Sequence, residues 1–233
     1  MLKLSNLSKI YSRHGKSVSA IDGISLQIDK GDFVAIIGPS GSGKSSLLLM
    51  MGGMLSPSNG EICLEDQSIF DLSSRQRAAL RQEKIGFLFQ TFNLVPYLSA
   101  LQNVLLPMLF GGLDKGSRRN RALTLLDEMG LADRVDHKPS ELSIGQQQRV
   151  AFARMLANDP PLILADEPTG SLDPEMSHQM IAFLKELNEK GKTIVLVTHD
   201  LNVARQANRV IEISKGGAIV TIQEGATLEI ALS

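Results

Sequence analysis

Residues 38–45 read Gly38-Pro39-Ser40-Gly41-Ser42-Gly43-Lys44-Ser45. This glycine-rich loop fits the pattern G-x-x-x-x-G-K-[ST], whose backbone N–H groups cradle phosphates. It follows the apolar run Phe33–Ile37, typical of a buried strand, and precedes an apolar stretch from Lys44 to about Met54, typical of a helix. A helix N-terminus after such a turn adds partial positive charge. The sequence therefore predicts a nucleoside triphosphate site.

Four side chains of the loop and of the residue after it have chemistry that suits a triphosphate. We expect Lys44 to reach the β- and γ-phosphates and the Ser45 hydroxyl to ligate Mg²⁺. Ser42 and Ser46 are expected to add phosphate contacts. The alternative is a flexible connection between strand and helix that binds no ligand. The strand before the loop and the helix after it favour the nucleotide site.

Two carboxylates, Asp166 and Glu167, follow the apolar run Leu162–Ala165. A strand end beside the phosphate loop is where a magnesium-organising aspartate belongs, so Asp166 is predicted to take that role. Glu167 is predicted to face the γ-phosphate and to orient or deprotonate the attacking water. His199 follows another buried strand, Thr193–Val197, at the same edge of the sheet. It is either a structural side chain or a γ-phosphate sensor.

Strand and helix signals alternate in the first and last thirds of the chain, which predicts an α/β fold with a mainly parallel sheet. Between Gln90 and about Asp159 the strand signals fade and helical signals take over. One predicted helix there carries an apolar face at helical spacing and ends at Gly130. We expect a single domain, with a core of about residues 1–90 and 161–233 and a helical subdomain of about residues 91–160.

Composition excludes several classes of protein. The chain has 233 residues, 43% of them apolar, which excludes disorder. Cys63 is the only cysteine, so there is no intrachain disulfide. Lys and Arg number 24 and Asp and Glu 25, which argues against nucleic acid as a partner. We find no apolar run of the roughly 18 residues a membrane span needs and no signal peptide, and expect a cytoplasmic protein.

The segment Leu142–Gln146 is a third motif, in addition to the phosphate loop and the carboxylate pair. Ser143, followed three residues later by Gln146, predicts a capping box that opens a helix to about Asn158. Such an N-terminus also offers free N–H groups and a dipole to an anion. One chain cannot place both this anion site and the phosphate loop on the same γ-phosphate unless the fold brings them together.

With these motifs the chain resembles, over essentially its whole length, the ATP-binding cassette family, the ATPase subunits of ABC transporters. The resemblance implies a P-loop NTPase fold, with a RecA-like core, an N-terminal antiparallel β-subdomain and an inserted helical subdomain, and the cofactors ATP and Mg²⁺. It implies that Gln90 contacts Mg²⁺ and the lytic water, and that His199 is the switch histidine. Ser171-Leu172-Asp173 resembles the D-loop, and Tyr11 the aromatic residue that stacks on adenine.

The family also implies a second copy of the chain as a partner. Two subunits pair head to tail, so that Ser143, Gly145 and Gln146 of one reach the γ-phosphate of the ATP held by the other. Ile144 departs from the pattern, which usually has glycine there. A β-branched residue does not readily take a positive φ, so a turn that needs one would be strained. We expect Ser143 and Gly145 still to bind the γ-phosphate, with weaker closure of the dimer.

Residues 87–96, 100–104, 146–150 and 165–170 resemble the lipoprotein-release and macrolide-export group of the family. This resemblance implies an integral-membrane permease as partner, export of a lipid, lipoprotein, peptide or drug, and a peripheral location at the inner face of the cell membrane. The apolar residues from Phe92 to Leu98 either seat a short coupling helix of that permease or pack locally.

Two further functions share some of these motifs. The first is a nucleotide-gated switch that signals through a membrane partner without cargo, as division-linked members of the family do, and the subunit's sequence does not separate it from transport. The second is a small-molecule kinase, which shares the phosphate loop but does not explain Ser143 to Gln146, Glu167 and His199 together.

Overall fold

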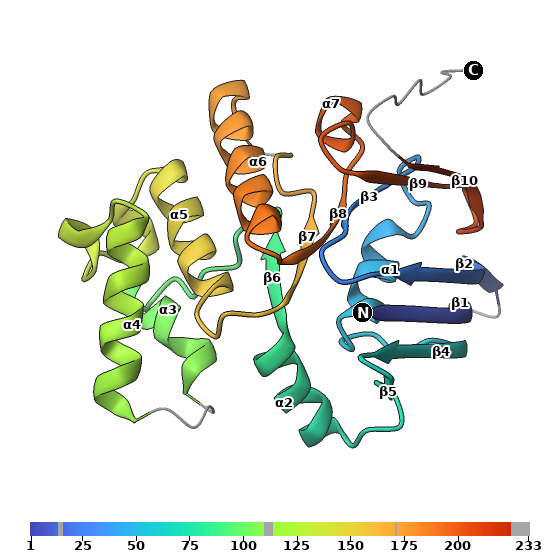
Figure 1. The fold of residues 1–233 in the computed structure, drawn as a ribbon, viewed down its shortest axis with the longest axis horizontal. Coiled ribbons are helices and arrows are strands. Elements are labelled where there is room, and N and C mark those ends of the chain that lie inside the picture. Colours follow the sequence, from blue (N-terminus) through green and yellow to red (C-terminus); the bar gives the residue numbers. More distant parts are fainter. Residues whose placement is uncertain (14–15, 110–113, 171, 225–233) are drawn as a thin grey trace.

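Two β-sheets, with helices packed around them, form the fold (Figure 1). The computed structural model describes residues 1–13, 16–109, 114–170 and 172–224, so Ser171 of the expected D-loop lies outside the described residues. The antiparallel sheet has the order β2-β1-β4-β5. Its strands are β1 (Leu2–Arg13), β2 (Lys16–Ile28), β4 (Asn59–Leu64) and β5 (Gln67–Ser68).

The second sheet has the order β10-β9-β3-β8-β7-β6. Its first five strands along the chain are β3 (Phe33–Ile37), β6 (Ile85–Phe89), β7 (Leu162–Asp166), β8 (Thr193–Val197) and β9 (Arg209–Ile213), and neighbours among them run parallel. The edge strand β10 (Ile219–Glu224) pairs antiparallel with β9. The turn before it carries Gly216 and Gly217, both at positive φ.

The helices divide into groups by position (Figure 1). The longer ones are α1 (Lys44–Met51), α2 (Ser74–Lys84), α4 (Lys115–Glu128), α5 (Ile144–Met155) and α6 (Pro174–Glu189), and α3 (Ala100–Leu105) and α7 (Leu201–Ala204) are short. Short 3₁₀ segments span Leu106–Met108, Ala132–Arg134 and Pro139–Glu141. Helices α3, α4 and α5 gather on the side of the parallel sheet away from the antiparallel sheet.

Alternate residues of each parallel strand face two different apolar cores. In β3, Phe33 and Ala35 join the core that contains α3 to α7, whereas Val34 and Ile36 join the core formed with α1 and the antiparallel sheet. A sheet covered on both faces explains why these strands read as continuous apolar runs. Both faces of the sheet are therefore covered. The parallel strands β3, β7 and β8 are neighbours, so their carboxyl ends lie together at one end of the sheet.

The predicted fold class is confirmed, and two predicted helix ends are wrong. Helix α1 ends at Met51 rather than Met54, because Gly52 and Gly53 follow it and Gly53 has a φ of 65°. Helix α5 ends at Met155, three residues before Asn158, where Leu156 caps it. Apolar residues of α3, α4 and α5 share one continuous core with the parallel sheet, so the inserted helices do not form a core of their own.

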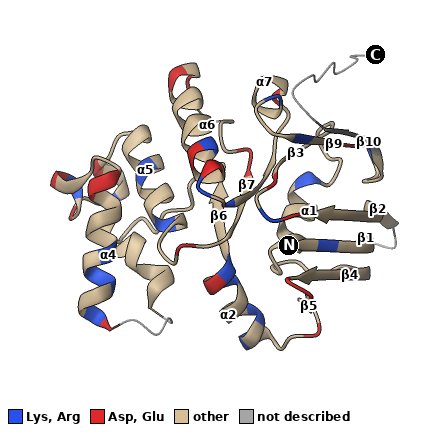
Figure 2. Ribbon diagram, viewed as in Figure 1, with Lys and Arg blue, Asp and Glu red and all other residues tan. Residues whose placement is uncertain are grey.

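The surface carries both signs of charge on the same elements. Figure 2 shows basic and acidic residues together on α2 and on α6. Within the described part of the chain, none of the helices has both the length and the apolar character that crossing a membrane requires.

Candidate active site

The glycine-rich loop connects the buried strand β3 to helix α1. A Cβ atom at Gly43, whose φ is 90°, would lie 2.1 Å from the carbonyl oxygen of Ala20. At Gly38 it would lie 2.3 Å from the carbonyl oxygen of Ile213. Both positions therefore require glycine for the loop to pack this closely. No side chain among the described residues caps α1, so its first N–H groups remain available to an anion.

A pocket of about 350 Å³ lies over this loop. It is lined by Ala20, Ser40, Gly41, Ser42, Gly43, Lys44, Ser45, Ser46, Glu167 and His199. The Lys44 ammonium donates to the carbonyl oxygens of Gly38, at 2.8 Å, and Pro39, at 3.1 Å. The buried Ser42 hydroxyl has no hydrogen-bond partner among the described residues. Buried hydroxyls are ordinarily paired, so this group fits a ligand that brings acceptor oxygens, as a triphosphate does.

A hydroxyl and a carboxylate meet beside the loop. The Ser45 Oγ donates to Asp166 Oδ1 at 2.9 Å, although 121 positions separate the two residues. Burial raises the pKa of Asp166, and the hydrogen bond from Ser45 opposes that shift. No three His, Cys, Asp or Glu side chains of the described residues converge on a metal site. One carboxylate and one hydroxyl fit Mg²⁺, which takes its other ligands from phosphates and water.

Glu167 and His199 form the other wall of the pocket. The His199 Nδ1 atom lies 2.9 Å from Glu167 Oε1, and the backbone N–H of His199 points to Oε2 at 3.4 Å. The backbone N–H of Glu167 donates to the Val197 carbonyl at 2.9 Å, which ties β7 to β8 just beyond the sheet. Glu167 has a φ of 45°, a conformation that costs free energy in a non-glycine residue and is frequent at active sites. The carboxylate is thus fixed where it can accept a proton.

Gln90 follows β6 at the same edge of the sheet. Its Nε2 atom lies 2.8 Å from the position a Cβ atom would take at Gly170, so the amide packs against the segment after Glu167. Among the described residues, those that line the phosphate pocket do not include Gln90. The structure therefore places Gln90 against Gly170, near the Glu167 carbonyl, and outside the wall of the pocket.

Tyr11 stands at the rim of the site. Its hydroxyl is 3.2 Å from the Ser46 Oγ on α1, and the Lys9 ammonium is 5.3 Å from the ring centroid. The residue is 44% exposed, so the ring has free surface on which a base can stack. The contact with Ser46 links the aromatic ring to the phosphate loop.

The Ser143 segment lies outside the phosphate pocket. Ser143 Oγ accepts from the N–H of Gln146 at 3.2 Å, and Gln146 Oε1 accepts from the N–H of Ser143 at 2.9 Å, which is the predicted capping box. Ile144 is 60% exposed and opens α5 with a φ outside the left-handed region, so its branched side chain is not strained there. A Cβ atom at Gly145 would lie 2.6 Å from Met176 Cε. Asp173 caps α6 by accepting from the N–H of Met176 at 2.9 Å.

Sequence reasoning missed three residues that organise this region. Asn103 is fully buried, and its amide group bonds the backbone of Val95, Leu98 and Ser99. Met176 covers Gly145, and Arg154 bonds the loop after Gln90. Only Arg154 had a signal in the sequence, since a single cation interrupts the apolar segment Val150–Leu156.

Comparisons with known proteins identify the family of the chain. The family model described as "ABC transporter" matches residues 21–170. The chain is 48% identical over 221 residues to the ABC transporter ATP-binding protein MJ0796 of Methanocaldococcus jannaschii, covering 93% of this chain and 94% of that protein. It is 47% identical over 219 residues to the macrolide export ATP-binding/permease protein MacB of Hyphomonas neptunium. That match covers 94% of this chain but 34% of MacB, so the chain spans about a third of that relative.

A solved structure described as dimeric MJ0796, a bacterial ABC transporter cassette, superposes with a TM-score of 0.89 and 45% identity. The match covers 96% of this chain and 98% of that one. A second structure of MJ0796, described as a post-hydrolysis state bound to ADP and Pi, superposes with the same TM-score and 44% identity. On the family match and on relatives covered almost end to end, the chain belongs to the ABC transporter family of ATP-binding proteins.

Proposed function

We propose that the chain is the ATP-hydrolysing subunit of an ABC transporter, which dimerises on MgATP and drives a separate membrane permease, with export as the direction. The observation that carries the proposal is the meeting of two contacts at one pocket. Ser45 with Asp166, and Glu167 with His199, flank a loop built for phosphates. A metal-holding pair and a proton acceptor on either side of a triphosphate are the parts that phosphoryl transfer to water needs.

The residues divide the work of hydrolysis between them. The loop N–H groups and Lys44 hold the phosphates, and Tyr11 stacks on the adenine. Ser45, Asp166 and Gln90 would hold Mg²⁺, which neutralises charge on the phosphates when it is bound. Glu167 orients the attacking water and accepts its proton, and His199 keeps the Glu167 carboxylate in place through the 2.9 Å contact.

A second copy of the chain completes each site in this proposal. Ser143, Gly145 and Gln146 present a helix N-terminus that the chain's own phosphate pocket does not use. The solved MJ0796 structures are described as dimers. In a head-to-tail pair, this N-terminus would close on the γ-phosphate held by the partner. Asp173 lies one contact away, through Met176, and would face the same interface.

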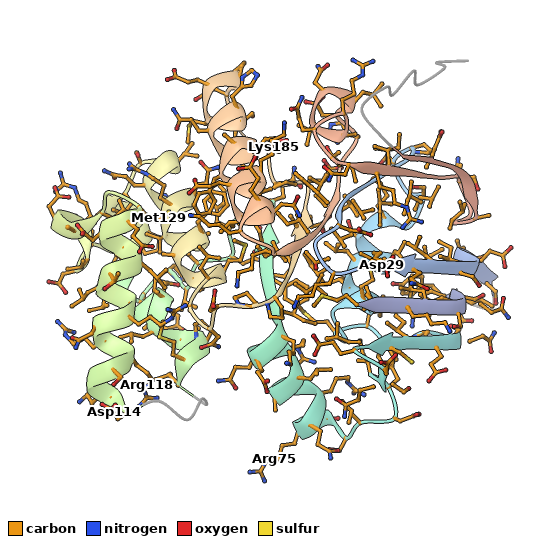
Figure 3. All side chains as sticks on the ribbon, viewed as in Figure 1. Asp29, Arg75, Asp114, Arg118, Met129 and Lys185 are labelled. Carbon is orange, nitrogen blue, oxygen red and sulfur yellow. The ribbon has the colours of Figure 1, made fainter. Side chains whose placement is uncertain are left out.

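The permease is proposed to bind at a groove of about 830 Å³ between α2, β6 and the C-terminal end of α5. Figure 3 labels Arg75, which lines the groove, at the far end of α2. Tyr97 is 74% exposed on the loop that Asn103 holds, four residues after Asn93, which lines the groove. The MacB relatives, whose names include a permease, extend well beyond the matched third. With a permease bound at this groove, the chain would lie at the cytoplasmic face of a membrane. Nucleic acid is not a partner in this proposal.

Residues 92–98 were expected either to pack locally or to seat a coupling helix of the permease, and each interpretation fits part of the segment. Phe92 is buried and Leu94 packs against the core that contains α3 and α5, which is local packing. Pro96 and Tyr97 are exposed and are the residues proposed to meet the permease.

The purified chain tests the proposal directly. We expect magnesium-dependent release of phosphate from ATP, and stimulation of that release by the reconstituted permease. Replacing Tyr97 with Glu should abolish stimulation and leave basal hydrolysis unchanged, whereas Tyr97→Phe, which keeps the ring, should retain both. Full complex formation by Tyr97→Glu would reject the docking surface. Hydrolysis without any movement of cargo would favour the nucleotide-gated switch over transport.

A further inference from the structure

Arg154 is a half-buried cation that the proposed hydrolysis does not use. It lies near the end of α5, and its guanidinium donates hydrogen bonds to the carbonyl oxygens of two successive residues. Nη1 donates to Asn93 at 2.6 Å and Nη2 to Phe92 at 2.5 Å. Burial lowers the pKa of Arg154, a shift that leaves a guanidinium fully charged near neutral pH. A planar fork with two donors suits two neighbouring acceptors, which an ammonium group does not match.

The two carbonyls belong to strained backbone. Phe92 has a φ of 57° and Asn93 a φ of 48°, both in the left-handed region. Two consecutive non-glycine residues in that region persist only when their surroundings hold them there. Local turn hydrogen bonds join Phe92 N–H to the Phe89 carbonyl at 3.0 Å and Asn93 N–H to the Thr91 carbonyl at 2.6 Å. The charge-assisted bonds from Arg154 supply the long-range support.

This strained turn lies at the meeting point of three parts of the molecule. Gln90, which is expected to contact Mg²⁺ and the lytic water, is two residues before Phe92. Asn93 and Arg154 both line the 830 Å³ groove proposed for the permease. The opposite end of the helix that carries Arg154 is the Ser143 N-terminus proposed to bind the partner's ATP. A rigid helix links that N-terminus to the guanidinium.

We propose that Arg154 is a positioning residue, which fixes Gln90 at the hydrolysis site by holding the strained turn at Phe92 and Asn93. This inference rests on the proposed function. It also assigns a task to a residue that touches neither nucleotide nor metal.

Arg121 offers a matched control. It donates to the carbonyl oxygens of Ala157, at 2.6 Å, and Leu156, at 3.1 Å, just after α5, and so has the same chemistry at the same helix end without contact to the turn at Phe92. The test compares Arg154→Lys with Arg121→Lys in the full chain. Lysine keeps the charge and most of the stem but loses the fork. Arg154→Met, which keeps the stem alone, is the stronger variant.

Arg154→Lys is expected to lower kcat and to raise the Mg²⁺ concentration for half-maximal hydrolysis, each by about 10-fold, as loss of a group that orients a metal ligand does. KM for ATP should change less than about twofold, because the loop and Tyr11 still bind it. Hydrogen–deuterium exchange of residues 90–98 without nucleotide should accelerate in Arg154→Lys and not in Arg121→Lys.

Equal losses in the two lysine variants would overturn the inference, since they would report only on packing at the end of α5. Unchanged kcat, Mg²⁺ dependence and exchange in a folded Arg154→Lys would also overturn it. Should neither variant fold, exchange in the wild-type chain decides: residues 90–98 must be protected to a degree comparable with α5. A wild-type chain that does not hydrolyse ATP would instead reject the proposed function. The exchange comparison would then still test whether Arg154 holds the turn at Phe92 and Asn93.

Discussion

His199 and Glu167 are joined by a 2.9 Å contact between Nδ1 and Oε1, and the backbone N–H of His199 lies 3.4 Å from the second carboxylate oxygen. The carboxylate side chain is 17% exposed and the imidazole 70%. Together with the left-handed backbone of Glu167, these contacts leave the carboxylate little freedom to turn. We therefore expect His199 to position Glu167, and any contact that His199 makes with a γ-phosphate would come from the side of the imidazole that faces solvent.

Replacing Glu167 with Gln should lower kcat by about 10²–10⁴-fold, the share that a positioned general base contributes. The amide keeps the shape of the carboxylate and accepts no proton from water. ATP binding should survive, so ATP-bound dimers should accumulate and be seen by size-exclusion chromatography. If the two side chains act as the proposed unit, Glu167→Gln with His199→Ala should be no slower than Glu167→Gln alone. A double variant slowed by the product of both effects would show that His199 works independently of Glu167.

Asp166→Asn should stabilise the nucleotide-free protein near neutral pH. Burial raises the pKa of Asp166, so the folded state holds the proton more tightly than the unfolded state does. The stabilising effect of protonation is fully present below the ordinary value of about 3.9 and is lost as pH rises through the folded pKa. The melting temperature of the variant should thus exceed that of the wild type at neutral pH, with the gap closing toward about pH 4.

Thermal unfolding across that pH range, with Asp136→Asn as an exposed control, makes the measurement. MgATP should stabilise the wild type and fail to stabilise Asp166→Asn, because the proposed metal ligand is lost. A variant less stable than the wild type at neutral pH would mean that the bond from Ser45 outweighs desolvation.

The fold and most of the site followed from local pattern, for a physical reason. Phe33–Ile37 is apolar throughout because the sheet is covered on both faces, and the strand, loop and helix that hold Lys44 are adjacent in the chain. Arg154 and Met176 were not predicted as functional because their partners, Asn93 and Gly145, are distant in sequence and are reached only in the fold. A backbone carbonyl or a glycine leaves no trace of its partner in a sequence.

Gly145→Ala should change the free energy of unfolding by less than about 1 kcal/mol, because the gain in helix propensity offsets the displacement of a flexible methionine end. The added Cβ would lie 2.6 Å from Met176 Cε, so the methionine must move. In a Met176→Ala background, where no side chain has to move, the same change should stabilise the chain by up to about 1 kcal/mol. A double-mutant cycle by urea unfolding measures this coupling. Additive effects would mean that the methionine end moves freely and that Gly145 and Asp173 are not linked through it.

Ile144→Gly should leave the rate of ATP hydrolysis unchanged or raise it. Ile144 is 60% exposed at the start of α5, beside the N–H groups proposed to receive the partner's γ-phosphate, and its removal opens the approach to them. Glycine in a helix costs about 1 kcal/mol, so a small drop in melting temperature is expected. Ile144→Ala separates the two effects, because it removes most of the side chain while favouring the helix. Measurement of kcat and of ATP-dependent dimerisation for both variants makes the test, and a large loss of activity in both would show that the branched side chain itself closes the dimer.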